Sequence, residues 1–238
     1  MNLKVSNYNA IKIKPFSLKR KDKIGSGCNG KIYRFGDNEV IKKWKINSFP
    51  MMNDGVVDQL DKMSRLNINW AVFPNRLALF GRRIKGYTMD YIDGSKMSYC
   101  GDFDYSFFLS KFNEYKNGCL EEMNSRNIIM SDVKPANIMW DNVNSVFRSI
   151  DVDDWYESNC PDHYISNRNF RLINNAFAYY FIYYINYNLQ KDALKLDDSS
   201  DFIDFYETVR YELSKQTDDE LITMNDVRRH TYLYGKKK

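Results

Sequence analysis

The fold is decided by residues 128–140, which read Ile128-Ile129-Met130-Ser131-Asp132-Val133-Lys134-Pro135-Ala136-Asn137-Ile138-Met139-Trp140. Apolar residues open and close this stretch, and the polar residues lie between them. Because apolar runs are buried in a core, a short polar loop between two of them is held rigidly. The stretch therefore predicts a fixed loop that presents Asp132, a lysine two residues later (Lys134) and an asparagine five residues later (Asn137).

The three polar side chains of this loop suit phosphoryl transfer. A carboxylate such as Asp132 can orient a hydroxyl group, the amide oxygen of Asn137 can bind Mg²⁺, and the ammonium of Lys134 can meet phosphate charge. Asp, Lys, Pro and Asn are also common turn residues, so the loop by itself is equally consistent with a surface turn. A second acid, Asp151, follows a short predicted strand and could supply the remaining metal ligand, which favours phosphoryl transfer.

A glycine-rich stretch near the start of the chain, residues 24–32, fits three kinds of phosphate-binding loop. Its glycines are Gly25, Gly27 and Gly30. They have the GxGxxG spacing of dinucleotide-binding folds and kinases, and with Lys31 they fit most of a P-loop. A P-loop requires Ser or Thr next, where this chain has Ile32. Both the P-loop and the dinucleotide fold also require a helix directly after the glycines.

The residues after the glycines predict a β-hairpin and no helix. Residues 32–35 read as a strand, Gly36-Asp37-Asn38 as a turn, and residues 39–44 as a second strand. A glycine loop between two strands can fold over phosphates, because glycine lets the backbone approach their oxygens. A plain glycine-rich turn is the alternative. In the second strand, alternation puts Lys42 and Lys43 on opposite faces, and the apolar neighbours favour Lys42 as the one that points inward.

In series, these motifs resemble eukaryotic-type protein kinases, most closely the Ser/Thr kinases. Residues 132–137 are similar to the kinase catalytic loop, and Asp151 stands where kinases have a metal-binding aspartate. Val40-Ile41-Lys42 is similar to the strand whose lysine pairs with the α- and β-phosphates. The resemblance covers roughly residues 20–185, with the motifs in the kinase order.

The resemblance implies an α+β, bilobal protein kinase-like fold that binds ATP and Mg²⁺. Residues 1–92 would form a small N-lobe, an antiparallel β-sheet with one helix, and residues 93–238 a larger, mostly helical C-lobe of the same kinase domain. The implied catalytic residues are Asp132 and Lys134, and the implied metal ligands are Asn137 and Asp151. The implied cofactor-binding residues are Ile24, Gly25, Gly27, Gly30, Ile32, Lys42, Met89, Asp90 and Tyr91.

The chain departs from the kinase pattern in the helix that follows the strand lysine. An amphipathic helix is predicted over residues 53–67, where kinases supply a glutamate to that lysine. This sequence offers only Asp58 or Asp61, each a methylene shorter, and a solvated face for both is an equal alternative.

Two further departures concern the loop and the segment after Asp151. Met130 and Ser131 stand where kinases usually have His and Arg, and Asp153 replaces a usual glycine. The segment then continues without an Ala-Pro-Glu signature. Because the missing arginine normally binds a phosphate on this segment, we expect a fixed, shortened segment and activity that needs no phosphorylation there.

The rest of the chain predicts helices and strands of the core that carry no catalytic residue. Residues 173–187 predict a hydrophobic helix, in which Asn174 or Asn175 is the candidate to bond the catalytic-loop backbone. Two strands are predicted at 73–80 and 86–94, a core helix at 107–126, and closing helices at 201–211 and 218–229.

Composition and charge narrow the classes of partner and the cellular location that we expect. The 238 residues can bury one sizeable core or a small lobe beside a larger one, and a net charge of +4 without a basic stripe disfavours nucleic acid. Four widely spaced cysteines and two histidines argue against a zinc site and for reduced thiols in a cytoplasmic protein. We expect no signal peptide at the start of the chain, and the most apolar run, residues 177–185, is too short to span a membrane.

The resemblance implies ATP-dependent transfer of the γ-phosphate to a Ser/Thr hydroxyl of a protein. Lys134 favours this acceptor, because aminoglycoside- and choline-kinase relatives share the Asp and Asn spacing but generally lack that lysine. The shortened segment favours a small-molecule acceptor instead. The missing glutamate leaves a third alternative, a pseudokinase that binds nucleotide or a partner without transferring phosphate.

Overall fold

The computed structural model describes residues 8–14, 17–45, 54–182, 211, 214 and 223–227. The chain divides into two compact units, unit 1 (Met1–Ile92) and unit 2 (Asp93–Lys238).

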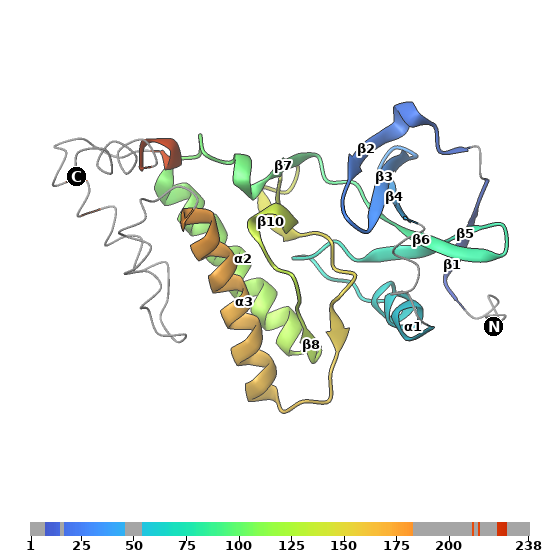
Figure 1. The fold of residues 1–238 in the computed structure, drawn as a ribbon. Helices are drawn as coiled ribbons and strands as arrows, with labels where there is room; N and C mark the ends of the chain where they lie inside the picture. The colour runs from blue at the N-terminus through green and yellow to red at the C-terminus, as the bar shows by residue number, and fades with distance from the viewer. Residues whose placement is uncertain are drawn as a thin grey trace. The chain divides into compact units, whose positions relative to one another are not determined.

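Unit 1 is a β-sheet with one α-helix and a 3-10 turn (Arg20–Asp22) in its described part (Figure 1). Its elements are β1 (Ala10–Ile13), β2 (Lys23–Ser26), β3 (Gly30–Phe35), β4 (Glu39–Trp44), α1 (Asp54–Met63), β5 (Pro74–Phe80) and β6 (Arg83–Asp90). The six strands lie in the order β1-β5-β6-β4-β3-β2. Every neighbouring pair is antiparallel except β1 and β5, which run parallel, so the expected antiparallel sheet gains a parallel edge strand.

The glycine-rich stretch joins two strands, as the sequence predicts. β2 ends at Ser26 and β3 begins at Gly30, and no helix follows the glycines. The predicted hairpin is also confirmed, because β3 and β4 pair antiparallel around a turn at Gly36, whose φ is +73°. This left-handed conformation suits glycine.

Helix α1 ends earlier than predicted, at Met63 instead of residue 67, and packs against β5 (Figure 1). Two hydrogen bonds of the i to i+3 type, from Arg65 N to Lys62 O and from Leu66 N to Met63 O, tighten the chain after the helix. Bonds of this type commonly close the last turn of an α-helix.

Unit 2 consists of two long helices and two small sheets in its described part. Its elements are β7 (Gly94–Lys96), α2 (Tyr105–Asn124), β8 (Ile128–Ile129), β9 (Ile138–Asp141), β10 (Val146–Ser149), β11 (Tyr156–Glu157) and α3 (Asp162–Ile182), with 3-10 turns at Met97–Tyr99 and Pro135–Asn137. One sheet has the order β10-β9-β7, and the other pairs β11 with β8.

Helices α2 and α3 lie side by side and bury an aromatic core (Figure 1). Phe112 on α2 stacks on Phe177 on α3 with 4.2 Å between ring centroids, and Phe108 stacks on Tyr180. The core helix predicted at 107–126 is confirmed as α2, two residues earlier at each end, and five residues at three- and four-residue steps along it are buried. They are Phe108, Phe112, Tyr115, Cys119 and Met123.

The predicted start of the hydrophobic helix, residue 173, is wrong. Helix α3 begins at Asp162, directly after Pro161, and both residues are typical of a helix start. The predicted end at residue 187 lies outside the described residues. The predicted helices at 201–211 and 218–229 also fall almost wholly outside them, although residues 224–227 are helical.

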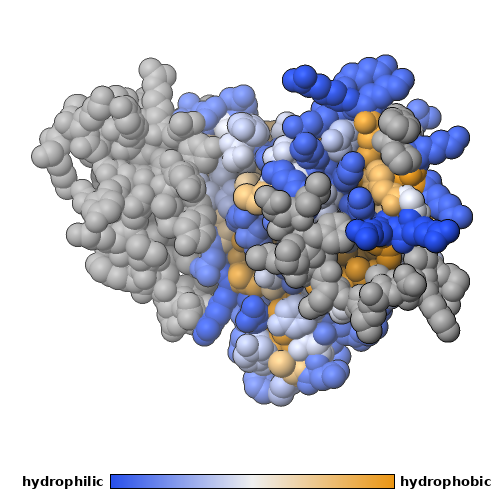
Figure 2. Space-filling model, turned by 45° about the vertical axis from the view of Figure 1, so that its right-hand side comes forward, coloured by the Kyte–Doolittle hydropathy of each residue, from blue (hydrophilic) through white to orange (hydrophobic). Residues whose placement is uncertain are grey.

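No helix in the described ranges combines the length and apolar character needed to cross a bilayer. Among the coloured residues of Figure 2, hydrophilic ones predominate, and hydrophobic ones gather in separate areas.

Candidate functional site

In unit 1, sheet register places four of the predicted cofactor-binding residues on one face. Gly25 pairs with Ile32, and Ile32 pairs with Lys42 across β3 and β4. Lys42 in turn pairs with Tyr87 on β6, and Val40 pairs with Met89 two positions along. Because residues opposite each other point to the same side of a sheet, the side chains of Ile32, Lys42 and Met89 share a face with Gly25.

Lys42 is buried, with 5% of its surface exposed. Its ammonium lies 5.7 Å from the centroid of the Tyr87 ring, within the range of a cation–π contact. Lys43 points to the opposite face, where its ammonium lies 5.0 Å from the centroid of Phe80, as the alternation predicts. Gly30 lies against the Lys42 stem, because a Cβ added there would be 3.2 Å from Lys42 Cγ.

The two candidate carboxylates of α1, Asp58 and Asp61, both accept hydrogen bonds within unit 1. Asp58 accepts a hydrogen bond from the Tyr8 hydroxyl at 2.5 Å. Asp61 accepts one from the Asn9 amide at 2.7 Å and an ion-paired one from Arg65 at 2.8 Å. Both carboxylates therefore bind residues just before β1 or on the turn after α1.

Of the predicted cofactor-binding residues, Asp90 ends β6 and Tyr91 follows it directly. The Asp90 carboxylate accepts a hydrogen bond from Asn75 Nδ2 at 2.8 Å. The Tyr91 amide donates to Asn38 O at 2.8 Å, so it is used inside the unit. The Tyr91 ring lies 3.3 Å from the Arg34 guanidinium carbon, a stacked cation–π contact.

The glycine turn has a support that the sequence did not single out. The Lys45 ammonium donates to Gly27 O at 2.5 Å, and the Lys45 amide donates to Asn29 O at 2.9 Å. Ile24 lies at a register shift in β2 and is 50% exposed. Alternation does not reveal the role of Lys45, because the residue comes just after the end of β4.

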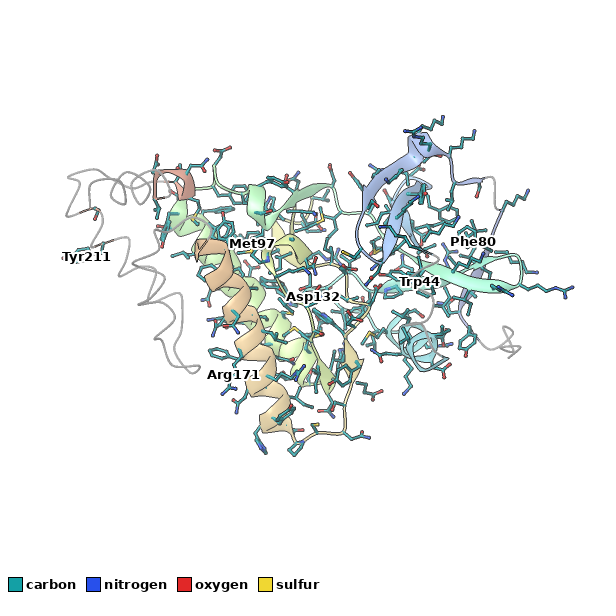
Figure 3. The ribbon with its side chains drawn as sticks, viewed as in Figure 1. Trp44, Phe80, Met97, Asp132, Arg171 and Tyr211 are labelled. Atoms are coloured by element: carbon teal, nitrogen blue, oxygen red, sulfur yellow. The ribbon has the colours of Figure 1, made fainter. Side chains whose placement is uncertain are left out.

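In unit 2, the loop brings Asp132, Lys134 and Asn137 together (Figure 3, where Asp132 is labelled). The Lys134 ammonium donates to both carboxylate oxygens of Asp132, at 2.9 and 2.7 Å. Asn137 Nδ2 donates to the Asp132 carbonyl at 2.9 Å and to its carboxylate at 3.0 Å. Both charged side chains are about half exposed (45% and 49%), so this ion pair adds little stability and mainly sets geometry.

Asp132 and Asp151 both have left-handed backbones, with φ of +50° and +62°. A non-glycine residue adopts this region at a cost of about 1–2 kcal/mol, so such residues persist where their surroundings fix them. The Ile150 amide donates to Asn137 O at 2.8 Å, which places Asp151, the next residue, beside Asn137. The two predicted metal ligands are thus on backbone segments that a hydrogen bond joins, although they are far apart in the sequence.

Asn169 on α3 holds the start of the loop, a role that the sequence interpretation gave to Asn174 or Asn175. It accepts from the Met130 amide at 2.9 Å and donates to Ile128 O at 2.8 Å and Asn124 Oδ1 at 2.9 Å. Asn175 is exposed, and Asn174 Nδ2 has no partner among the described residues. The assignment failed because the helix begins before residue 173.

The residues present fit a bound Mg²⁺ in donor type. Asn137 uses its amide nitrogen on Asp132, and none of the described hydrogen bonds uses its Oδ1, the atom a metal needs. Nowhere in the described ranges do three or more His, Cys, Asp or Glu side chains gather as a metal site. Mg²⁺ nevertheless needs only one or two protein ligands, because substrate phosphates and water complete its shell.

No protein-family model matches this sequence, and no curated protein matches it. Solved structures, in contrast, are similar to this chain. The crystal structure of Rad53 residues 1–466 in complex with AMP-PNP matches with a TM-score of 0.53 and 16% identity, covering 68% of this chain and 46% of that chain. The Mycobacterium tuberculosis PknI kinase domain, crystallised as a double mutant, matches with a TM-score of 0.50 and 15% identity, covering 67% and 70%. The chain thus spans less than half of the Rad53 structure, and the described part has a mixed α and β fold similar to that of Ser/Thr protein kinase domains.

Proposed function

We propose that this chain is an ATP-dependent phosphotransferase that transfers the γ-phosphate to a Ser/Thr hydroxyl of a protein. The observation that carries the proposal is the loop geometry, in which Lys134 bonds both oxygens of Asp132 and Asn137 caps the same residue. In this proposal, unit 1 and unit 2 are the two lobes of one kinase domain.

Each side chain then has a defined role. The half-exposed carboxylate of Asp132 orients the acceptor hydroxyl and takes its proton. Lys134 holds that carboxylate and offers positive charge to the transferred group, while Asn137 Oδ1 and Asp151 hold Mg²⁺. Lys42, on the sheet face with Gly25, Ile32 and Met89, binds phosphate oxygens. Bound Mg²⁺·ATP would supply the phosphoryl group and neutralise charge on the phosphates.

A small-molecule acceptor is the second candidate, and one observation favours it. β11 ends at Glu157 and α3 begins at Asp162, so little chain lies between Asp151 and the helix. A short segment offers little surface on which a peptide could rest.

The test is phosphate transfer from γ-labelled ATP to a cell extract by the full chain and by two variants. Asp132→Asn should lower transfer by about a thousandfold, because it removes the base. Asp154→Asn is the matched control, since Asp154 is also an exposed acid of unit 2 and should change little.

Labelled protein bands would support the protein acceptor, and labelled small molecules would support the second candidate. Binding of ATP·Mg²⁺ with no transfer or hydrolysis, unchanged in Asp132→Asn, would overturn both and leave a nucleotide-binding pseudokinase.

A further inference from the structure

Trp155, in the segment after Asp151, reaches the loop that carries Asp132. Its side chain is 1% exposed, and its indole Nε1–H donates a hydrogen bond to the carbonyl oxygen of Ser131 at 2.7 Å. The Trp155 amide donates to Val152 O at 3.1 Å, closing a turn between Asp151 and the ring. One side chain thus connects the segment to the loop.

The carbonyl that Trp155 binds belongs to the peptide group just before Asp132. The peptide group just after Asp132 is held too, because Asn137 Nδ2 donates to its carbonyl at 2.9 Å. The φ of Asp132 is +50°, a conformation that a non-glycine residue keeps only where its surroundings over-determine it. Both peptide planes that flank the Asp132 Cα are therefore fixed by one side-chain N–H each.

Strand pairing holds Trp155 in place. The next two residues form β11, which pairs antiparallel with β8 through Tyr156 opposite Ile129 and Glu157 opposite Ile128. The Ser158 amide then donates to Asn127 O at 2.8 Å. Since β8 leads directly into the loop, the segment and the loop form one connected structure in which the indole cannot withdraw alone.

We propose that Trp155 is a positioning residue for Asp132. Its indole N–H fixes the Ser131–Asp132 peptide group and thereby the direction of the Asp132 carboxylate. The residue that does this is uncharged and lies in the segment after Asp151. The inference rests on the proposed function for its kinetic consequence, because it takes Asp132 as the catalytic carboxylate. The structural link itself stands apart from any reaction.

The first measurement is steady-state transfer by the full-length chain, with a mixture of random-sequence Ser/Thr peptides as acceptor. Trp155→Phe keeps an aromatic ring but removes the indole N–H together with part of the ring volume, leaving the Ser131 carbonyl without that donor. The control below loses the same volume. We expect kcat to fall about tenfold and KM for ATP to stay within about twofold.

The matched control is Trp44→Phe. Trp44, labelled in Figure 3, lies on β4 and is 5% exposed, and its indole Nε1 has no hydrogen-bond partner among the described residues. The same substitution there removes no hydrogen bond, so kcat and KM should both match those of the unmodified chain.

The second measurement is amide hydrogen exchange of residues 128–140, which needs no reaction. Trp155→Phe should speed exchange of the loop by about tenfold, and Trp44→Phe should leave it unchanged. Faster loop exchange in Trp155→Phe, in a chain that transfers no phosphate, would overturn the proposed function while upholding the link between Trp155 and the loop.

Several results would overturn the inference. The first is unchanged loop exchange in Trp155→Phe. The second is transfer by Trp155→Phe at the full rate, and the third is an equal loss in both variants. A rise in KM for ATP without a fall in kcat would also count against it, because that pattern belongs to nucleotide binding.

Discussion

In unit 1, the candidate residues are aligned by the hydrogen-bond register of a sheet, whereas in unit 2 they are aligned by single side chains that bond a loop backbone. Lys42 shares its face with Ile32 and Met89 because the three strands pair in that register. Asp132 has its direction because Asn137 and Trp155 each hold one of its neighbouring peptide groups.

The difference predicts how each region responds to substitution. The β-sheet of unit 1 is held by many backbone hydrogen bonds, so a single side-chain substitution should shift only its immediate neighbours. A loop supported by single side chains loses a whole hydrogen bond with each substitution, and a buried partner group that stays unpaired costs about 1–3 kcal/mol. Unit 2 should therefore be the more sensitive of the two.

The largest expected effect is at Asn169. Asn169→Leu leaves the buried Met130 amide and Ile128 carbonyl without their partner, and it should lower the free energy of unfolding by about 3 kcal/mol in urea titration. Asn174→Leu, on the same helix, is the control, since Asn174 Nδ2 has no partner in the described part of the chain. It should be neutral or slightly stabilising. Equal losses in the two variants would show that the loop does not depend on Asn169.

The next largest effect tests close packing in the sheet. Gly30→Ala places a Cβ 3.1 Å from Lys43 O and 3.2 Å from Lys42 Cγ, and it should cost about 1–2 kcal/mol of stability. At Gly27 a Cβ meets nothing within 4 Å, so Gly27→Ala should change stability by less than about 0.5 kcal/mol. Thermal melting of both variants measures the difference, and a tolerated Gly30→Ala would mean that the sheet yields more easily than its register suggests.

The sequence predicted the parts of this molecule that depend on local pattern. Alternation distinguished Lys42 from Lys43, and the turn at Gly36 predicted the hairpin. The spacing of the loop predicted that Asp132, Lys134 and Asn137 would lie together.

The sequence did not predict the residues whose role depends on tertiary register. Asn169 precedes the helix that periodicity predicts, and nothing local indicates that its side chain meets the backbone of β8. Trp155 looks like an ordinary aromatic residue until β11 is paired with β8. The sequence placed Asp58 and Asp61 on the predicted helix. Only the fold shows that their partners are Tyr8, Asn9 and Arg65.

A smaller effect concerns the apolar support behind the loop. Cys119 lies on α2 with its sulfur 3.7 Å from the Met130 sulfur, and burial raises the pKa of its thiol from 9.0 to about 12. Above pH 9 the unfolded thiol ionises while the folded one stays protonated, so the unfolded state binds fewer protons and stability falls as pH rises from 9 toward 12. At pH 10 this thiol should account for about 1.4 kcal/mol of lost stability.

Urea titrations at pH 8 and pH 10 measure that loss, with Cys119→Ala as the control. The alanine variant is less stable at both pH values because of the cavity, but its stability should fall less between them. An equal fall in both proteins would mean that the thiol reaches solvent, and that the support behind the loop is looser than its burial indicates.

The last prediction is that a treatment has no effect. It tests whether side chains of unit 2 alone order the loop that carries Asp132. The segment after Asp151 is held by the pairing of β11 with β8, by the Ser158 amide on Asn127 O and by Trp155, and none of these contacts uses a phosphate. Phosphatase treatment of the purified chain, and Tyr156→Phe at the exposed tyrosine of β11, should therefore leave the transfer rate within about twofold. A large loss in either case would mean that added charge orders the segment. The side-chain hydrogen bonds of unit 2 would then not be enough to account for how Asp132 is placed, and the contrast with the strand register of unit 1 would fail.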